Sequence, residues 1–227
     1  MKKTGIIAAM DEEVEVVSKL MDSKKVEKKY ELEFIEGNIN NSNIVLVKCG
    51  IGKVNAARCT QILINNYHVD EVINVGSAGS VNDNLNIGDI VIGQTTVQHD
   101  FDITAFGHDK GYISNVGKIF ESDEQLINRI QSASNTISNC NVKKGIIATG
   151  DIFCTSIEMK EKIRDKFNAD CVEMEGAAIA QVCTLDNIPF AIIRSISDKP
   201  NGNNNMDFNT FLEQSVKNYA DIINGLF

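Results

Sequence analysis

Short runs rich in Ile and Val recur along the chain and predict β-strands. Several of these runs are continuous rather than alternating, which is typical of strands that are covered on both faces by helices. The predicted strands are Gly5–Ala9, Glu31–Ile39, Ile44–Cys49, Glu71–Val75, Asp89–Ile92, Gly145–Thr149, Ala169–Glu173 and Phe190–Ser195.

Segments with apolar residues at helical spacing lie between the runs. The last of them has Phe211, Tyr219 and Ile222 on one face, together with Leu212 and Ser215. The alternation of strand and helix predicts an α/β fold with a central, twisted, mixed but mainly parallel sheet flanked by helices. No composition break divides residues 1–227, so we expect a single domain. The predicted helices are Glu12–Met21, Lys53–Asn65, Asp123–Ile137, Ile157–Phe167, Glu175–Leu185 and Asn209–Leu226.

Composition narrows the class of function. The 227 residues are 43% hydrophobic and 23% charged, with a net charge of −9. Such an acidic chain lacks the basic field of a protein that binds nucleic acid or an anionic membrane, and we expect neither partner. No apolar run approaches the roughly 18 residues of a membrane span. The three histidines lack metal-ligand spacing, so no metal site is expected.

The cysteines and the N-terminus both favour a cytoplasmic protein. The six cysteines form no CxxC motif and sit mostly in apolar context, which is typical of buried free thiols in a reducing compartment. Lys2 and Lys3 precede a short apolar stretch, as in a signal peptide, but acidic residues follow it at once. We therefore interpret the N-terminus as a strand that leads into a helix.

Three connecting segments stand out. Asn38–Asn43 is typical of a hairpin turn, and Pro200–Asn205 is a polar surface loop. Residues 94–120 are predicted to be irregular and contain Phe101 and Phe106. Two exposed phenylalanines are unfavourable unless something covers them, which indicates a subunit interface.

Two glycine-containing segments follow predicted strands. Gly50–Val54 resembles a phosphate-binding loop but lacks the spacing of a P-loop or a dinucleotide fingerprint, so a tight turn is the favoured interpretation. Gly76–Gly79 permits close approach of a ligand to the backbone, or forms a turn; the pattern leaves both open.

Polar residues gather where predicted strands end. Met10–Glu13, Glu173–Glu175 and Arg194–Asp198 each follow or end a strand, and the carboxyl ends of strands are where α/β sheets bind ligands. Acidic residues at helix starts also stabilise the helix dipole without any chemistry. Glu175 leads into an apolar helix, so it should be buried, with Arg194 as its expected partner. That pairing is explained equally by structure and by function.

Six segments that occur in order carry a resemblance to a known family. They are Gly5–Val14, Gly50–Ala57, Gly76–Gly79, Asp102–Gly107, Val172–Ala180 and Arg194–Asp198.

Over essentially its whole length the chain resembles bacterial 5′-methylthioadenosine/S-adenosylhomocysteine nucleosidases, which belong to the purine nucleoside phosphorylase superfamily. The resemblance implies a partly barrel-like sheet and a cytoplasmic homodimer that needs no metal or cofactor. It also implies hydrolysis of the N-glycosidic bond of both thio-nucleosides, in methionine salvage and in removal of a methyl-cycle by-product.

The resemblance also implies roles for residues. Glu13 corresponds to the general base that holds the attacking water, Asp198 to the acid that protonates adenine N7, and Ser197 to the group that orients Asp198. Arg194 corresponds to a residue that fixes the water and the Glu175 carboxylate. The implied substrate contacts are Met174 and Glu175 on the ribose, Ser77 and Gly79 beside it, Phe153 and the Cys154 backbone on adenine, Met10, Ile51 and Phe208 as pocket walls, and Ile103 and Phe106 from the partner subunit.

Three residues depart from the family pattern: Ser80, Cys154 and His108, the last of which could alter the wall supplied by the partner. Glu13 should remain ionised, whereas Asp198 should be protonated when adenine binds, which an apolar or anionic setting favours.

Two rival functions remain. A phosphorolytic enzyme needs several cationic groups for phosphate, and the chain has only four arginines. A nucleoside sensor on the same scaffold would be expected to lack one of the two working acids.

Overall fold

The strands and helices follow the alternation expected from the sequence. The computed structural model describes residues 2–135, 137, 140–200 and 217–227. Strands are β1 (Lys3–Ala8), β2 (Asp22–Lys29), β3 (Leu32–Ile39), β4 (Ser42–Lys48), β5 (Glu71–Ser80), β6 (Ile90–Gln98), β7 (Phe120–Glu121), β8 (Val142–Thr149), β9 (Cys171–Glu173) and β10 (Phe190–Asp198). Helices are α1 (Asp11–Lys19), α2 (Lys53–Tyr67), η1 (Thr104–Phe106, 3₁₀), α3 (Glu124–Ser134), α4 (Ile157–Phe167) and α5 (Gly176–Leu185).

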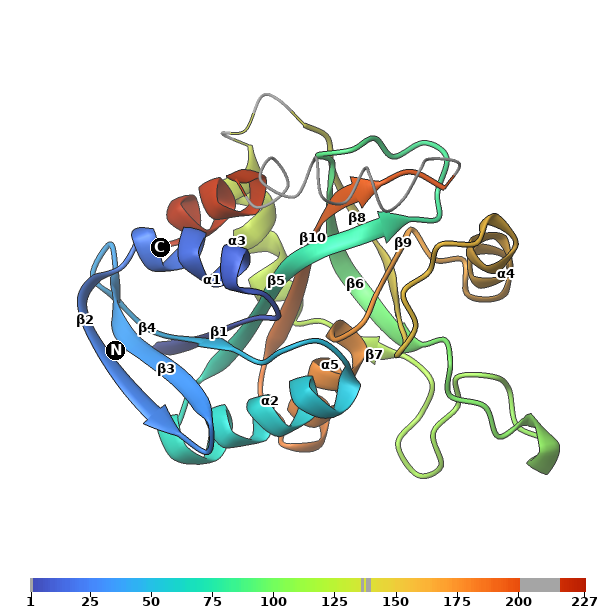
Figure 1. Cartoon of the computed structure of the whole chain (residues 1–227), viewed down its shortest axis with the longest axis horizontal. Coiled ribbons are helices and arrows are strands. Elements are labelled where there is room, and N and C mark those ends of the chain that lie inside the picture. Colours follow the sequence, from blue (N-terminus) through green and yellow to red (C-terminus); the bar gives the residue numbers. More distant parts are fainter. Residues whose placement is uncertain (1, 136, 138–139, 201–216) are drawn as a thin grey trace.

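One sheet runs through the molecule, and part of it closes on itself (Figure 1). Its strand order is β10-β6-β8-β9-β5-β1-β4-β3-β2, and β10 also pairs with β5. The strands β5, β10, β6, β8 and β9 therefore form a closed ring, while β1, β4, β3 and β2 extend from it as an open sheet. Parallel pairings join β4, β1, β5 and β10, so these strands have their carboxyl ends on one side. Antiparallel pairings elsewhere make the sheet mixed.

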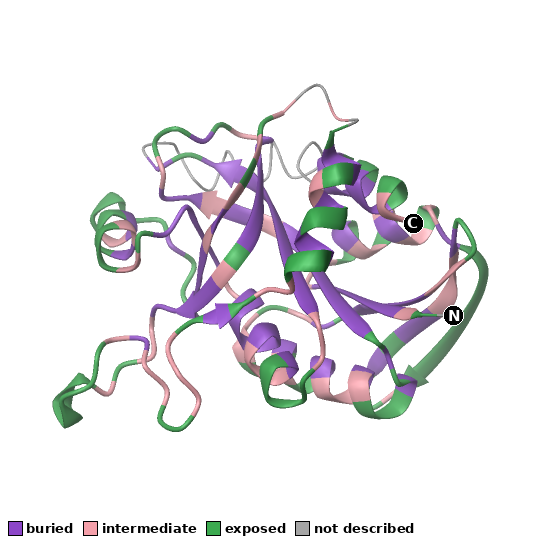
Figure 2. Ribbon diagram, turned by 180° about the vertical axis from the view of Figure 1, so that it is seen from behind, coloured by how far each residue is buried: buried purple, intermediate pink, exposed green. Residues whose placement is uncertain are grey.

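Helices cover the sheet on both faces, as the continuous apolar strands predict. One core packs α2 and α5 against the strands, through residues such as Leu63 and Ile179. The other packs α1, α3 and the C-terminal helix, residues 217–226, through Val17, Ile130 and Tyr219. Figure 2 shows the resulting pattern, with buried strands between helices that are exposed only on their outer sides. No helix in the described part of the chain is long and apolar enough to span a bilayer.

Some boundaries differ from the sequence-based predictions. β2 was not predicted, because nearly all of its residues are polar and exposed. It joins β3 through a turn at Tyr30 and Glu31, both with positive φ, so the predicted start of that strand at Glu31 is wrong. The hairpin turn between β3 and β4 is confirmed at Asn40 and Asn41.

Several strands run further than predicted, among them β10, which ends at Asp198 rather than Ser195. β5 continues through the small residues Gly76–Ser80, and β6 extends to Gln98, so residues 94–98 are not irregular. Beyond β6, residues 99–118 form an extended arm that projects from the body at the lower right of Figure 1. The last predicted helix is present over 217–226; its earlier positions, including Phe211, Leu212 and Ser215, and most of the loop at 200–205 lie outside the described residues.

Candidate active site

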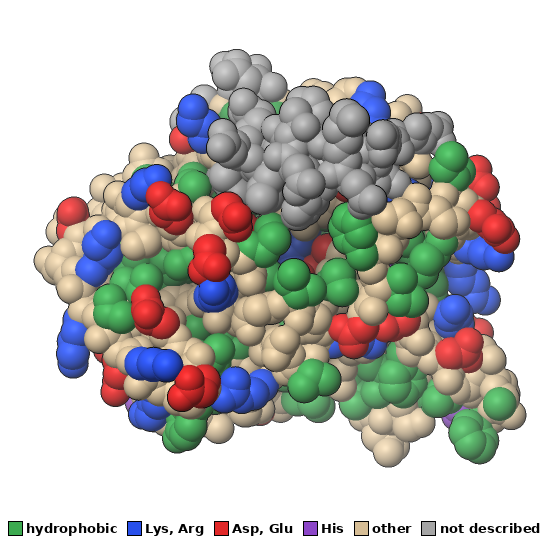
Figure 3. Space-filling model, viewed as in Figure 1, with side chains coloured by type: hydrophobic (Ala, Val, Ile, Leu, Met, Phe, Trp, Pro, Cys, Tyr) green, Lys and Arg blue, Asp and Glu red, His purple; other side chains and the backbone are tan. Residues whose placement is uncertain are grey.

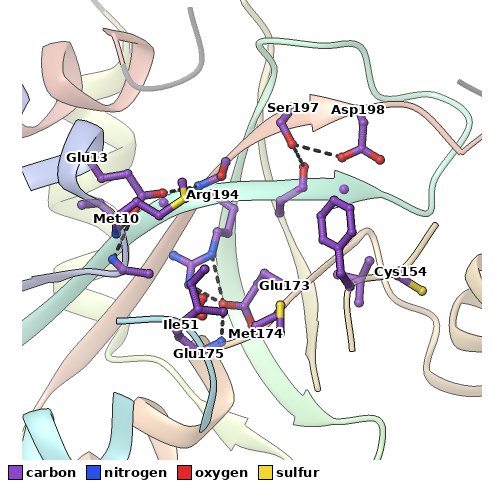
Figure 4. Close-up of a pocket in the computed structure, with 18 of the residues that line it drawn as sticks. Met10, Glu13, Ile51, Cys154, Glu173, Met174, Glu175, Arg194, Ser197 and Asp198 are labelled. Atoms are coloured by element: carbon purple, nitrogen blue, oxygen red, sulfur yellow. Dashed lines mark hydrogen bonds and ion pairs between the residues drawn. The ribbon is translucent and has the colours of Figure 1, made fainter. Parts of the chain in front are cut away.

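A pocket that is partly open to solvent lies at the carboxyl ends of β1, β4, β5 and β10. Figure 4 shows acidic side chains entering it from separate elements. All the sequence-predicted site residues in the body of the molecule line it: Met10, Glu13, Ile51, Ser77, Gly79, Phe153, Cys154, Met174, Glu175, Arg194, Ser197 and Asp198.

Glu13 is held in place by backbone N–H groups. It occupies the third position of α1 and is only 1% exposed. Its Oε2 accepts hydrogen bonds from the N–H groups of Ala9 (2.9 Å) and Met10 (3.1 Å), and its Oε1 accepts one from Ser77 (3.1 Å). Burial raises the pKa of the Glu13 carboxyl above its usual value, and Arg194 and these three donors oppose the rise. Glu13 thus both caps its helix and faces the pocket.

A β-bulge brings Ser197 and Asp198 into the same pocket. Neighbouring residues of a regular strand point to opposite faces, but the pairing of β10 with β5 shifts register between Ile196 and Asp198. The Ser197 hydroxyl donates its single proton to Asp198 Oδ1 (3.0 Å), and the carbonyl oxygen of Ala78 is the second acceptor within reach, at 3.3 Å. The orienting role of Ser197 stays a prediction, and this contact is the one that it requires.

The surroundings of Asp198 differ from the expected apolar or anionic setting. Lys160, on α4, places its Nζ 2.6 Å from Asp198 Oδ2, and both side chains are almost fully buried. The expectation for the setting of Asp198 is therefore wrong: the nearest charge is a cation.

Arg194 pairs chiefly with Glu173, rather than with Glu175 as expected. Its Nε donates to Glu173 Oε2 (3.1 Å), which also contacts Nη2. The guanidinium further donates to Asn74 Oδ1 (2.5 Å). Glu175 lies 4.0 Å from Arg194 and instead accepts a hydrogen bond from the Gly52 N–H (2.9 Å). The reason is position: Glu173 ends β9, which pairs with β5 as β10 does, while Glu175 has already left the strand.

The cluster around Arg194 is short of positive charge. Three buried carboxyl groups, those of Glu13, Glu173 and Glu175, share one guanidinium. Burial, followed by the charge of Glu173, raises the pKa of Glu175 to about 7. Such a cluster favours a cation in the pocket and disfavours an anion.

The glycines of two segments let carboxyl groups of the site approach the backbone closely. Gly50 and Gly52 have positive φ, which confirms the tight turn, and the turn aims the Gly52 N–H at Glu175. A Cβ on Gly76 would lie 3.1 Å from Glu13 Oε1, and one on Gly79 would lie 3.0 Å from Asp198 Oδ2. Gly76–Gly79 is thus a strand with small residues where carboxyl groups approach closely, not a turn.

Apolar side chains surround the pocket mouth. Ile51 and Phe153 are 54% and 50% exposed, and Ile152 lies beside Phe153. Figure 3 shows hydrophobic side chains gathered around the hollow in this face. Cys154 is buried below them. The site therefore combines an apolar rim with a charged floor.

The two residues predicted for the partner's pocket do not line the pocket of their own chain. Ile103 and Phe106 lie on the arm, outside the pocket lining, and Phe106 is 81% exposed. Phe208 lies outside the described residues. His108 stacks on Tyr112 within the arm, with ring centroids 4.6 Å apart. The departure at Ser80 has a local explanation, since its hydroxyl donates to the Asn82 carbonyl (2.7 Å).

Sequence reasoning missed Asn74 and Lys160, and it gave Glu173 no role although it placed that residue at a strand end. Asn74 is a lone polar residue inside the apolar run of β5, and Glu173 ends a buried strand. Lys160 shares a helix face with Ile163 and Phe167, and a lysine on an apolar face is a signal of a buried charge. Among the described residues no group of His, Cys, Asp and Glu is arranged to hold a metal ion.

Comparisons with known proteins agree with this geometry. The model of the phosphorylase superfamily matches residues 3–227. A 5′-methylthioadenosine/S-adenosylhomocysteine nucleosidase of Geobacillus sp. (strain WCH70) is 40% identical over 222 residues, which cover 97% of this chain and 96% of that protein. The chain belongs to this nucleosidase family of the phosphorylase superfamily.

The solved structures that are similar to this chain include enzymes with two different named activities. The nucleosidase of Neisseria meningitidis in complex with methylthio-immucillin-A matches with a TM-score of 0.96 and 37% identity, covering 100% of this chain and 98% of that one. The futalosine hydrolase of Helicobacter pylori strain 26695 matches with a TM-score of 0.94 and 34% identity, covering 99% and 97%. The fold is therefore shared by hydrolases with different named substrates.

Proposed function

We propose that this protein hydrolyses the N-glycosidic bond of 5′-methylthioadenosine and S-adenosylhomocysteine, releasing adenine and the thioribose. The observation that carries the proposal is the meeting of Glu13 and Asp198, which are far apart in the chain, around one pocket. The names of relatives at 40% identity over nearly the whole chain support the choice of substrate.

The charges of the site suit this reaction. As the C–N bond breaks, positive charge develops on the sugar and negative charge on the departing adenine. The excess of carboxylates around Arg194 would stabilise the sugar cation. Asp198 would deliver a proton to adenine N7 with Ser197 orienting it, and Glu13 would accept a proton from water. A raised pKa makes Glu13 a stronger base toward that water.

Water suits the site as nucleophile better than phosphate does. A phosphorolytic site needs several cationic donors. Of the four arginines only Arg194 lines the pocket, and its guanidinium is fully buried and bound to Glu173 and Asn74. Glu13, next to it, would repel an anion.

The other lining residues would recognise the substrate. Glu175 would accept hydrogen bonds from the ribose hydroxyls, beside Met174, and Phe153 would stack on adenine. Met10, Ile51 and Phe208 would form the apolar slot for the 5′-alkylthio group. Ser77, Gly79 and the Cys154 backbone would contact the ribose and the base.

A homodimer would complete the pocket. The exposed Phe106 is costly in water and projects on an arm away from its own site, so a second copy is the partner that suits it. Ile103 and Phe106 would then line the partner's slot. We place the protein in the cytoplasm, since all six cysteines are free thiols and five are buried.

Product analysis tests the function. Purified protein is incubated with each thio-nucleoside, with futalosine and with adenosine, with and without phosphate, and the purine and sugar products are identified. We expect free adenine and a non-phosphorylated thioribose from both thio-nucleosides, and slow turnover of adenosine. A phosphate requirement would support the phosphorylase alternative. Faster turnover of futalosine would make it the substrate, and no turnover at all would support a sensor.

A further inference from the structure

Lys160 is a buried cation in contact with the proposed acid. Its side chain is 1% exposed, and its Nζ lies 2.6 Å from Asp198 Oδ2 and 3.2 Å from the carbonyl oxygen of Lys199. The other oxygen of Asp198, Oδ1, accepts a hydrogen bond from Ser197. Both oxygens of Asp198 thus face donors, which is the arrangement of an ionised carboxylate.

An ionised Asp198 has no proton to give. If it is to protonate adenine N7, a proton has to reach it first, and the acid already in contact with it is the ammonium group of Lys160. The pair is buried, so neither side chain carries its charge alone without a large cost. The passage of one proton from Lys160 to Asp198 neutralises both groups and removes that cost.

We propose that Lys160 supplies the proton that Asp198 passes to adenine, and this inference rests on the proposed function. As the C1′–N9 bond breaks, its electron pair goes to adenine. N7 then gains the hydrogen from Asp198 Oδ2, and Oδ2 gains a hydrogen from Lys160 Nζ. Lys160 is left as a neutral amine and Asp198 remains ionised. The water that attacks C1′ leaves a proton on Glu13, and release of that proton and uptake of one by Lys160 reset the enzyme.

A cysteine thiol in the described part of the chain also acts on this pair. Cys154, in the loop before α4, interacts electrostatically with both Lys160 and Asp198. Burial raises the pKa of its thiol, so it stays neutral and does not compete as a base near pH 7. Lys160 acts through Asp198 and is therefore a positioning and proton-supplying residue, with no direct contact to substrate required.

The test compares variants that keep or remove the charge. K160R keeps a cation beside Asp198 but cannot give up a proton, because arginine stays protonated in proteins. K160M removes the charge, and K160Q is a second neutral variant in case K160M folds poorly. K162M is the matched control, since Lys162 lies on the same helix with its side chain 73% exposed. D198N serves as the reference for loss of the acid.

Two substrates distinguish a loss of proton supply from a loss of correctly folded enzyme. One is methylthioadenosine, and the other is the 4-nitrophenyl riboside with the same 5′-methylthio group, whose leaving group departs without a proton. For K160R, K160M and K160Q we expect kcat on methylthioadenosine to fall about 10²-fold or more with little change in KM, and the 4-nitrophenyl rate to stay near wild type. The alkaline limb of the kcat pH profile should change in the same variants, as in D198N, and K162M should match wild type throughout.

Wild-type kcat with K160R would overturn the proposal and leave Lys160 as an ion-pair partner only. An equal loss on both substrates would assign it a structural role. A measurement on the wild type alone gives an independent check: in single turnovers the solvent deuterium isotope effect should be larger with methylthioadenosine than with the 4-nitrophenyl substrate, and equal effects would contradict proton supply. Failure of the wild type to release adenine would instead overturn the proposed function.

Discussion

Asp198 lies opposite Gly79 in the parallel pairing of β10 with β5, and a Cβ on Gly79 would lie 3.0 Å from Oδ2 and 3.1 Å from Oδ1 of that carboxyl group. The Asp198 carboxyl group cannot easily move away, because its two oxygens accept hydrogen bonds from Lys160 and Ser197. We expect G79A to displace the acid by a few tenths of an ångström and to lower kcat about tenfold, since a shift of about 1 Å costs about 10²-fold.

Steady-state kinetics of G79A check this, with G225A as control. A Cβ on Gly225 would meet Ala133 at an ordinary 3.5 Å. G225A should therefore keep full activity and gain up to about 1 kcal/mol of stability from its helical position. Wild-type kcat in G79A would mean that the carboxyl group has room to move.

Glu13 and Asp198 are expected to act on opposite partners, one on water and the other on adenine. E13Q and D198N should each lower kcat/KM on methylthioadenosine by about 10²–10⁴-fold, the usual worth of a general acid or base. Adenine release measured on folded protein checks both. Near-wild-type activity in either variant would remove that residue from its assigned role.

Glu175 should make the stability of the protein depend on pH. Its pKa is about 7 in the folded protein against 4.5 for an unperturbed glutamate. The folded state therefore binds a proton more tightly, and this contribution to the free energy of unfolding is present below about pH 4.5 and is lost as pH rises to about 7, by up to about 3 kcal/mol.

Urea denaturation of wild type and E175Q from pH 5 to 8 measures this dependence. The free energy of unfolding of E175Q, relative to wild type, should increase with pH over that range. E175Q should also raise KM, because the ribose loses a charged acceptor. Parallel stability curves would show that Glu175 titrates alike in the folded and unfolded chain.

Arg194 is expected to hold the site together. R194M would leave Glu173 buried without its main cation, which costs about 3–5 kcal/mol of unfolding free energy. The double variant R194M/E173Q should recover part of the loss. R164M is the control, because Arg164 is a third exposed and its ion pairs with Asp83 and Asp165 should contribute less than about 1 kcal/mol. Denaturation experiments that rank R164M with R194M would contradict this view.

Substitution of the exposed Phe106 should show whether this side chain contacts a second copy of the chain. In an isolated chain F106S would leave the free energy of unfolding unchanged, because the ring already faces water. If the arm docks on a partner, F106S should weaken the dimer by roughly 10- to 100-fold in Kd, measured by sedimentation equilibrium. An unchanged Kd would exclude Phe106 from the interface.

The parts that the sequence predicted well are those that depend on local pattern. Continuous apolar runs located the central strands, and the polar residues that follow them located Glu13 and Asp198, because parallel strands bring their carboxyl ends together. The turn at Gly50–Gly52 followed from its glycines and its place between strand and helix.

The parts it missed depend on three-dimensional neighbours. β2 is almost entirely polar, and only its pairing with β3 makes it a strand. The choice of Arg194 between Glu173 and Glu175 depends on which acid remains in the closed ring of strands that also contains β10. The apolar helix face of Lys160 indicates burial, but its partner Asp198 is known only once α4 is packed against the sheet.

The sheet has a closed part and an open part, and the two differ in how they meet another molecule. Closure of the ring through β5 and β10 leaves no free backbone at that end, whereas β2 ends the open part. Lys24, Lys25, Lys28 and Lys29 lie along β2, and such charges repel the strand of another molecule that would add to it. Copies of this chain are thereby kept from joining into extended β-stacks, and association is left to side-chain surfaces such as the arm.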